Sequence, residues 1–252
     1  MDLIDSHIHL DDDRIDDIRD AIIERAATAS VTRMVVPATT ANRWEKVKQI
    51  CEQPCIYAAY GLHPMFIEQH QLAHLRELDE WLDREQPVAV GECGLDFYSS
   101  RADETWQKQL FVEQLQLSTN HKLPVIVHAR KAMDETISLL RKHANHGGVV
   151  HSFAGSEQQA RQLYDLGFKL GIAATVGFER AKKLRAVVAA MPDDALLLES
   201  DAPDQPGAAH RGELNEPAFI VEHLHTMADL RQVEPADLAK QLNRNAEQLF
   251  GI

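Results

Sequence analysis

The sequence predicts an α/β fold, a (β/α)8 TIM barrel in which residues 1–252 form a single domain. Eight short apolar segments recur along the chain, and amphipathic segments separate them. The apolar segments show little polar alternation, which is typical of parallel strands buried on both faces. A chain of 252 residues is also a usual length for such a barrel. An open doubly wound sheet is the alternative, but no G-x-G-x-x-G motif follows the first apolar segment.

The alternation of elements runs from one end of the chain to the other, without a low-complexity segment or a Gly/Ser-rich linker. The predicted strands cover 3–8, 33–38, 56–61, 87–92, 124–128, 148–152, 168–173 and 196–200. The predicted helices cover about 14–30, 41–53, 70–84, 103–121, 131–145, 156–166, 179–190, 216–230 and 235–249. Asp103, Ser156 and Pro235 stand where residues of these types begin helices. Gly167 directly follows a predicted helix, as a C-terminal cap does.

Composition restricts the location and the class of the protein. No apolar run approaches the roughly 18 residues needed to cross a bilayer, and the first residues lead into a strand instead of a signal peptide. The three cysteines, Cys51, Cys55 and Cys93, cannot all pair with one another, which favours reduced thiols. We therefore expect a cytoplasmic protein with no membrane contact and no obligate protein partner.

The net charge bears on the substrate. Lys and Arg number 26 and Asp and Glu number 39, so the formal charge is −13. Such a surface repels long nucleic acid. A nucleic-acid substrate would therefore have to be held locally, in a cleft that carries metal ions.

Two histidines near the N-terminus, His7 and His9, are the first residues that indicate chemistry. Leu3, Ile4 and Ile8 favour a strand here, and residues two apart in a strand share a face. Two imidazoles this close together suit one divalent metal ion. For this motif alone, two solvated histidines are an equal alternative.

Further histidines and carboxylates stand where later strands end. The carboxyl ends of barrel strands converge on one mouth, where active sites lie. In chain order these residues are His63, Glu92, His128, Arg130, His151 and Asp201. Each alone has an ordinary explanation, such as a hydrogen-bonded core histidine or a helix cap. Because buried charges and imidazoles need partners, a shared metal site accounts for most of them together.

Six of these residues are candidate metal ligands: His7, His9, Glu92, His128, His151 and Asp201. Six ligands exceed what one tetrahedral ion needs, and they suit two ions that share a carboxylate. Nitrogen ligands admit zinc or manganese, whereas a carboxylate-rich, partly open site admits magnesium. We therefore expect two divalent metal ions per subunit, either zinc, magnesium or manganese.

The motifs around these residues form a recognisable series. They are Asp5-Ser6-His7-Ile8-His9-Leu10, Gly61-Leu62-His63-Pro64, Gly91-Glu92-Cys93-Gly94-Leu95-Asp96, Pro124-Val125-Ile126-Val127-His128-Ala129-Arg130, Val150-His151-Ser152-Phe153, Glu199-Ser200-Asp201-Ala202-Pro203 and Asn215-Glu216-Pro217. In this order, and over essentially the whole chain, the series resembles the TatD family of metal-dependent deoxyribonucleases in the amidohydrolase superfamily. Cys93, Ser200 and Asp204 depart from the residues frequent in that family. None of the three removes a ligand, but Asp204 indicates a substrate rim that differs from that of some relatives.

The resemblance implies a role for each residue. His7, His9 and Asp201 would hold one ion. His128 and His151 would hold the other, with Glu92 bridging the two. His63 and Arg130 would face the substrate.

These expectations define a hypothesis for the activity. The protein would hydrolyse phosphodiesters, as a DNase or exonuclease at DNA ends, or act on a small phosphodiester substrate. Asp201 and Glu92 would be catalytic, with Asp201 accepting a proton from the attacking water. Arg130 would hold a phosphate oxygen or form a salt bridge to a loop acid, and His63 has a structural hydrogen bond as its alternative. Asp5 and Asp96 would orient ligands from outside the coordination shell or be ordinary turn residues.

Two other classes of function stay open. A hydrolase of the same superfamily would cleave an amide, a lactone or an ester of a small metabolite, because barrel chemistry varies through loops. A binding or scaffold protein would retain the metal site without turnover. Assays on single-stranded DNA beside esters and amides, with and without chelator, separate the three.

Overall fold

The computed structural model describes residues 2–144 and 146–252, and it shows one eight-stranded parallel sheet. The strands follow one another around the sheet in chain order, β1 to β8. They are β1 (Leu3–Asp5), β2 (Val31–Pro37), β3 (Ile56–Tyr60), β4 (Ala89–Asp96), β5 (Val125–Arg130), β6 (Gly148–Val150), β7 (Phe168–Ile172) and β8 (Leu196–Leu198). Backbone hydrogen bonds outside the ladders join the last strand to the first, with Ser6 N donating to Leu198 O at 3.0 Å. The sheet is thus a nearly closed barrel.

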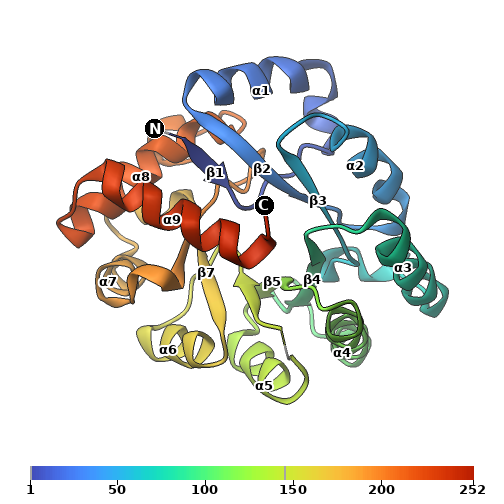
Figure 1. Cartoon of the computed structure of the whole chain (residues 1–252). Helices are drawn as coiled ribbons and strands as arrows, with labels where there is room; N and C mark the ends of the chain where they lie inside the picture. Colours follow the sequence, from blue (N-terminus) through green and yellow to red (C-terminus); the bar gives the residue numbers. More distant parts are fainter. Residues whose placement is uncertain (1, 145) are drawn as a thin grey trace.

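Helices surround the strands (Figure 1). They are α1 (Arg19–Thr28), α2 (Trp44–Ile50), α3 (Leu72–Glu85), α4 (Glu104–His121), α5 (Met133–His143), α6 (Glu157–Asp165), α7 (Lys182–Ala190), α8 (Ile220–Arg231) and α9 (Pro235–Phe250). The predicted (β/α)8 TIM barrel is confirmed. Residue 145, the last of the predicted helix 131–145, lies outside the described residues.

Several element boundaries differ from the predicted ones. The first strand ends at Asp5 instead of residue 8, so His7 and His9 follow the strand and do not belong to it. The cause is a change of partner: Ser6 N bonds to Leu198 O on one side, whereas Ile8 N bonds to Val35 O on the other. The fourth strand runs on to Asp96, so Glu92 lies inside a strand.

The first helix and the fifth, sixth and eighth strands also differ from their predicted bounds. A 3₁₀ helix over Asp13–Ile18 takes the first turns of the predicted helix 14–30. The fifth strand extends to Arg130, so His128 also lies within a strand and not after it. In β6 and β8 the ladder is shorter than predicted, so His151 and Asp201 stand in the connections just past Val150 and Leu198.

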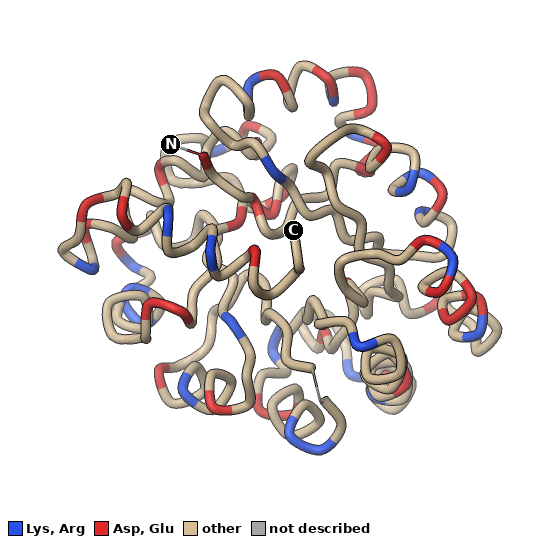
Figure 2. The backbone as a smooth tube through the Cα atoms, viewed as in Figure 1, with Lys and Arg blue, Asp and Glu red and all other residues tan. Residues whose placement is uncertain are grey.

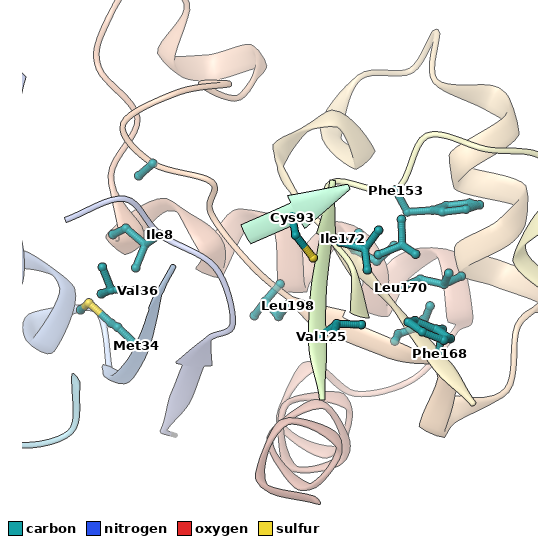
Figure 3. Packing of buried hydrophobic residues seen from close by; sticks show 14 of the residues in the cluster. Ile8, Met34, Val36, Cys93, Val125, Phe153, Phe168, Leu170, Ile172 and Leu198 are labelled. Carbon is teal, nitrogen blue, oxygen red and sulfur yellow. The ribbon is translucent and has the colours of Figure 1, made fainter. Parts of the chain in front are cut away.

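Two apolar cores hold the barrel together. The larger core packs the outward faces of the strands against the helices, and Figure 3 shows Phe168, Leu170 and Ile172 of β7 within it. The smaller core fills the barrel interior with one or two side chains from most strands. Phe250 and Ala246 of α9 join that inner core.

Helix α9 closes one end of the barrel. It crosses the strands in Figure 1, and its C-terminus ends over them. Asn243 Oδ1 accepts from Ile4 N at 3.2 Å, and Asn245 Nδ2 donates to Leu196 O at 2.8 Å. Because Ile4 and Leu196 belong to the amino ends of β1 and β8, the covered end is the amino end of the strands. The carboxyl ends, where the candidate ligands stand, remain open.

Charges of both signs alternate over the surrounding helices in Figure 2. Within the described residues, none of the helices combines the length and the apolar character required to traverse a bilayer.

Candidate metal centre

A cavity of about 1100 Å³ opens at the carboxyl ends of the strands. Among the residues that line it are His9, His63, Glu92, His128, His151 and Asp201. Six elements or their connections supply these side chains, which the sequence spreads over nearly 200 positions. The barrel thus brings the candidate ligands together, as the convergence of parallel strand ends requires.

One group of donor atoms comes from the connections that follow the first and the last strand. His7 Nε2 and His9 Nε2 are 3.2 Å apart. Asp201 Oδ1 lies 3.6 Å from His7 Nε2 and 3.7 Å from His9 Nε2. The connections after β1 and β8 meet here because Asp201 N donates to His7 O at 3.0 Å. The three atoms form a triangle that one cation would fill.

A second group surrounds Glu92. Its Oε1 lies 2.7 Å from His151 Nε2, 2.9 Å from His63 Nε2 and 3.1 Å from His128 Nδ1. Its Oε2 faces the other way, 3.1 Å from His7 Nε2 and 3.4 Å from His9 Nε2. One carboxylate therefore stands between the two sets of imidazoles.

These donor sets fit divalent metal ions. His7 Nε2 faces His9 Nε2, and His128 Nδ1 faces His151 Nε2 at 3.1 Å. Two imidazole lone pairs at such a distance repel unless a proton or a cation lies between them. Nitrogen and carboxylate donors are those that zinc, manganese and related ions take in proteins. Three groups of three donors each lie within 4.8 Å of one another: His7, His9 and Asp201; His7, Glu92 and His151; His63, Glu92 and His128.

The electrostatics favour positive charge at the centre. Burial acts to raise the pKa of Glu92, but His151, His63 and His7 outweigh it and hold that pKa well below its usual range. Burial lowers the pKa of His7 well below its usual range, which keeps this imidazole in the neutral form that binds metals. Burial also acts to lower the pKa of His9, yet Glu92 and Asp201 raise it to about 10. The carboxylates thus attract a cation to the position that His9 faces.

Asp5 and Asp96 contact the surroundings of the candidate ligands. Asp5 Oδ1 accepts from His7 N at 3.2 Å and from Ser200 N at 2.9 Å, which ties together the connections after β1 and β8. Asp96 Oδ2 lies 2.9 Å from His128 Nε2, the ring nitrogen that points away from Glu92. Both positions are those of carboxylates that orient ligands, which is the role that we predict for them.

Two further acids hold a similar position, and the sequence patterns did not single them out. Glu199 Oε1 accepts from Ser152 N and lies 3.9 Å from His151 Nδ1. Asp11 Oδ1 lies 4.0 Å from His9 Nδ1. Both side chains are buried. The signal for Glu199 was present, because an acid directly after Leu196–Leu198 is costly to bury unless it has partners.

His63 and Arg130 differ in their relation to the centre. His63 lines the cavity, but its Nε2 points at Glu92 and thus makes it a further candidate ligand. Arg130 stands at the cavity wall with its guanidinium 3.7 Å from the centre of the Tyr98 ring. No carboxylate of the described residues lies within ion-pair distance of it, and Asp96 acts on it only from farther away. Asp204, the acid that departs from the family pattern, pairs with Arg14, with 2.9 Å between Asp204 Oδ1 and Arg14 Nη1.

The comparisons with known proteins agree with this geometry. The model of the family described as TatD related DNase matches residues 4–251. The chain belongs to the TatD family. It is 40% identical over 255 residues to the uncharacterized metal-dependent hydrolase YjjV of Escherichia coli (strain K12), covering 99% of this chain and 98% of that one.

Other relatives give the same class. The uncharacterized metal-dependent hydrolase YabD of Bacillus subtilis (strain 168) is 32% identical, with 99% of each chain covered. The crystal structure of the TatD homologue YjjV from Escherichia coli K12 superposes with a TM-score of 0.95 at 37% identity, covering 99% of this chain and 98% of that chain. The protein is therefore a metal-dependent hydrolase of the TatD family.

Proposed function

We propose that this TatD-family hydrolase is a phosphodiesterase with two metal ions and that it acts on DNA ends in the cytoplasm. One observation carries the proposal: Glu92 directs one oxygen at His7 and His9 and the other at His128 and His151. A carboxylate in this position suits a bridge between two ions. The description of the matching family as DNases supports the choice of substrate.

The distances support an assignment of ligands. His7, His9 and Asp201 would hold one ion, and His128 with His151 would hold the other. His63 would complete the second set or donate a hydrogen bond to Glu92 Oε1. Two ions held in this manner would polarise a phosphate and lower the pKa of a bound water.

The chain's own residues would carry the proton and the substrate. The water oxygen attacks phosphorus, its proton passes to the carboxylate of Asp201, and the bond from phosphorus to the leaving alkoxide breaks. Burial raises the pKa of Asp201, against the opposing effect of His151 and His9. Gln205 Nε2 donates to Oδ2 and fixes its orientation.

The charge distribution favours a chain terminus over a long duplex. The chain carries −13 overall, and of the cations that line the cavity Arg43 and Arg101 are paired with acids. Among the described residues, no carboxylate lies within ion-pair distance of Arg130 or Lys131, although Asp96 acts on Arg130 from farther away. Two free cations can hold one or two phosphates beside the metal ions, but they make no track for a helix.

Hydrolysis assays on the metal-loaded protein test this proposal. The substrates are a short single strand of DNA, the matching closed duplex, and a panel of esters, lactones and amides. We expect cleavage of the single strand, loss of turnover with a chelator, and recovery when zinc, manganese or magnesium is restored. Turnover of the small esters, lactones or amides alone would overturn the proposal in favour of another amidohydrolase activity.

A further inference from the structure

Four exposed side chains stand beside the mouth: Met65, Phe66, Tyr98 and Arg130. We call this set the aromatic rim. Met65 is 58% exposed, Phe66 37% and Tyr98 61%. Met65, Phe66 and Arg130 line the cavity itself, and Tyr98 lies against Arg130. Exposed apolar side chains that gather beside a cavity indicate a binding surface, whereas single scattered ones do not.

Tyr98 and Arg130 form a preassembled pair. The guanidinium carbon lies 3.7 Å from the centre of the Tyr98 ring, a cation–π geometry. Phe97 N donates to Arg130 O at 2.9 Å, so the backbone also joins the two segments. No carboxylate within the described part of the chain lies within ion-pair distance of Arg130, although Asp96 acts on it from farther away. The pair therefore presents an aromatic ring beside an exposed guanidinium.

This pair is connected to the metal centre through one carboxylate. Asp96 Oδ1 accepts from Tyr98 N at 2.9 Å, and Asp96 Oδ2 lies 2.9 Å from His128 Nε2. The carboxylate that contacts His128 therefore also holds the backbone of Tyr98 in place.

The other side of the aromatic rim is connected in the same manner through His63. Its Nδ1 accepts from Met65 N at 3.0 Å, and its ring meets Phe66 edge to face at 5.9 Å. Its Nε2 contacts Glu92, and its ring centre lies 4.4 Å from that of His128. Each half of the rim is therefore linked to His128 through one intervening residue, Asp96 on one side and His63 on the other.

We infer that the aromatic rim binds an unpaired nucleobase beside the scissile phosphate, while Arg130 contacts the phosphate of the same nucleotide. This inference rests on the proposed phosphodiesterase function. Aromatic side chains stack on any base, because every base has a π face, and the free guanidinium supplies the matching charge for its phosphate. A paired and stacked base hides its faces, so the rim selects unpaired strand ends.

The test compares two strands that differ only in their bases. One is a short oligothymidylate, and the other has the same length and phosphates but tetrahydrofuran residues without bases. We expect the wild type to cleave the first with a kcat/KM about tenfold higher or more. Tyr98→Ala and Phe66→Ala should bring the two strands close to parity, while Tyr98→Trp keeps the preference. Leu72→Ala is the control, because Leu72 is 61% exposed in α3 but does not line the cavity.

A binding measurement separates the rim from catalysis. A phosphorothioate strand that contains 2-aminopurine resists cleavage, and its fluorescence falls when the base stacks. We expect quenching with the wild type and with Leu72→Ala, and a loss of quenching with Tyr98→Ala.

The outcomes distinguish this inference from the proposed function. Equal cleavage of both strands by the wild type, without quenching, would overturn the rim and leave the phosphodiesterase standing. Quenching without cleavage of either strand would support the rim and overturn the phosphodiesterase. Neither cleavage nor quenching would overturn both.

Discussion

The two oxygens of Asp201 have different surroundings. Oδ1 faces the imidazoles of His7 and His9, whereas Oδ2 accepts from Gln205. Replacement by Asn keeps the shape and one oxygen but removes the capacity to accept a proton. We expect Asp201→Asn to lower kcat by at least about 100-fold.

Its control is Asp204→Asn, because Asp204 is an exposed acid of the same connection that pairs with Arg14. That variant should keep near-normal turnover. Circular dichroism of both variants checks the fold. Near-normal turnover in Asp201→Asn would contradict the role as base.

Gly171 makes room for the buried carboxylate of Glu199. A Cβ on Gly171 would lie 2.0 Å from Glu199 Oε2 and 2.5 Å from its carboxyl carbon. Glu199 cannot withdraw freely, because Ser152 N donates to its other oxygen. We expect Gly171→Ala to destabilise the protein by about 1–3 kcal/mol, measured by urea unfolding.

Gly177→Ala provides the matched comparison, since a Cβ there meets nothing within 4 Å. It should change the free energy of unfolding by less than about 0.5 kcal/mol. A double variant, Gly171→Ala with Glu199→Ala, should be less destabilised than the sum of its parts. Simple additivity would show that the clash is relieved elsewhere.

The sequence predicted the site residues that stand alone after apolar segments, and it was less informative about their contacts. Convergence of the strand ends was enough to predict that Glu92 and His128 lie together. In the structure, Glu92 Oε1 is 3.1 Å from His128 Nδ1. It could not show that His63 points at Glu92, because that depends on a side-chain rotamer. Glu199 and Asp11 were overlooked because acids beside turns have many ordinary roles.

At the scale of elements, α9 has a role that no strand or helix pattern revealed. Phe250 is 5% exposed and packs into the inner core at the closed end of the barrel. We expect Phe250→Ala to lower the free energy of unfolding by about 3 kcal/mol, since it leaves a cavity. Metal affinity should hardly change, because the metal centre lies at the opposite end.

The comparison for Phe250→Ala is Val233→Ala, at a position that is 45% exposed. It should be close to neutral. Urea unfolding and metal titration of both variants check this. A large loss of metal affinity in Phe250→Ala would mean that the two ends of the barrel are coupled.

Local signals predicted the helices better than the strand ends. Ser156 caps α6 in a capping box with Gln159, and Gly167 follows that helix with φ of 82°. Such caps depend on residues within one turn, so the sequence contains them. The end of β1 depends instead on Leu198 and Val35, which are far away in the chain. Closure of the barrel determines such boundaries, and periodicity does not report it.

At the scale of the whole molecule, pH acts on stability through a buried histidine far from the candidate ligands in sequence. His223 is buried in α8, and burial lowers its pKa to about 4, against the opposing effect of its hydrogen bond to Glu199 O. The unfolded chain binds a proton there near pH 6.5, whereas the folded chain does so only near pH 4. Stability is therefore fully present above about pH 6.5 and is lost as the pH falls through this window.

The magnitude follows from the width of that window. Between pH 7 and pH 5 we expect the wild type to lose about 2 kcal/mol more than His223→Asn, which has no imidazole to protonate. Urea unfolding of both proteins at the two pH values measures this, and the carboxylates that titrate in both cancel. An equal loss in the two proteins would show that His223 is already protonated in the folded state or contacts water.

The charge of the whole chain predicts how DNA binding responds to salt. With −13 overall and only Arg130 and Lys131 free among the cations described at the cavity, few phosphates can be neutralised. The log of affinity for a short single strand should therefore fall with log salt at a slope of roughly one to three phosphates. Affinity should also drop sharply with a chelator, because the metal ions would supply most of the local positive charge.

Fluorescence anisotropy over a salt series, with and without chelator, measures both effects. Arg130→Ala should weaken binding of every sequence about equally, because a phosphate contact carries no base information. Arg76→Ala is the control, since Arg76 is an exposed arginine of α3 that does not line the cavity. A steep slope, or affinity unchanged by chelator, would mean that another basic surface binds the strand. The low number of free cations at the mouth makes that outcome the sharpest contradiction of a metal-centred substrate site.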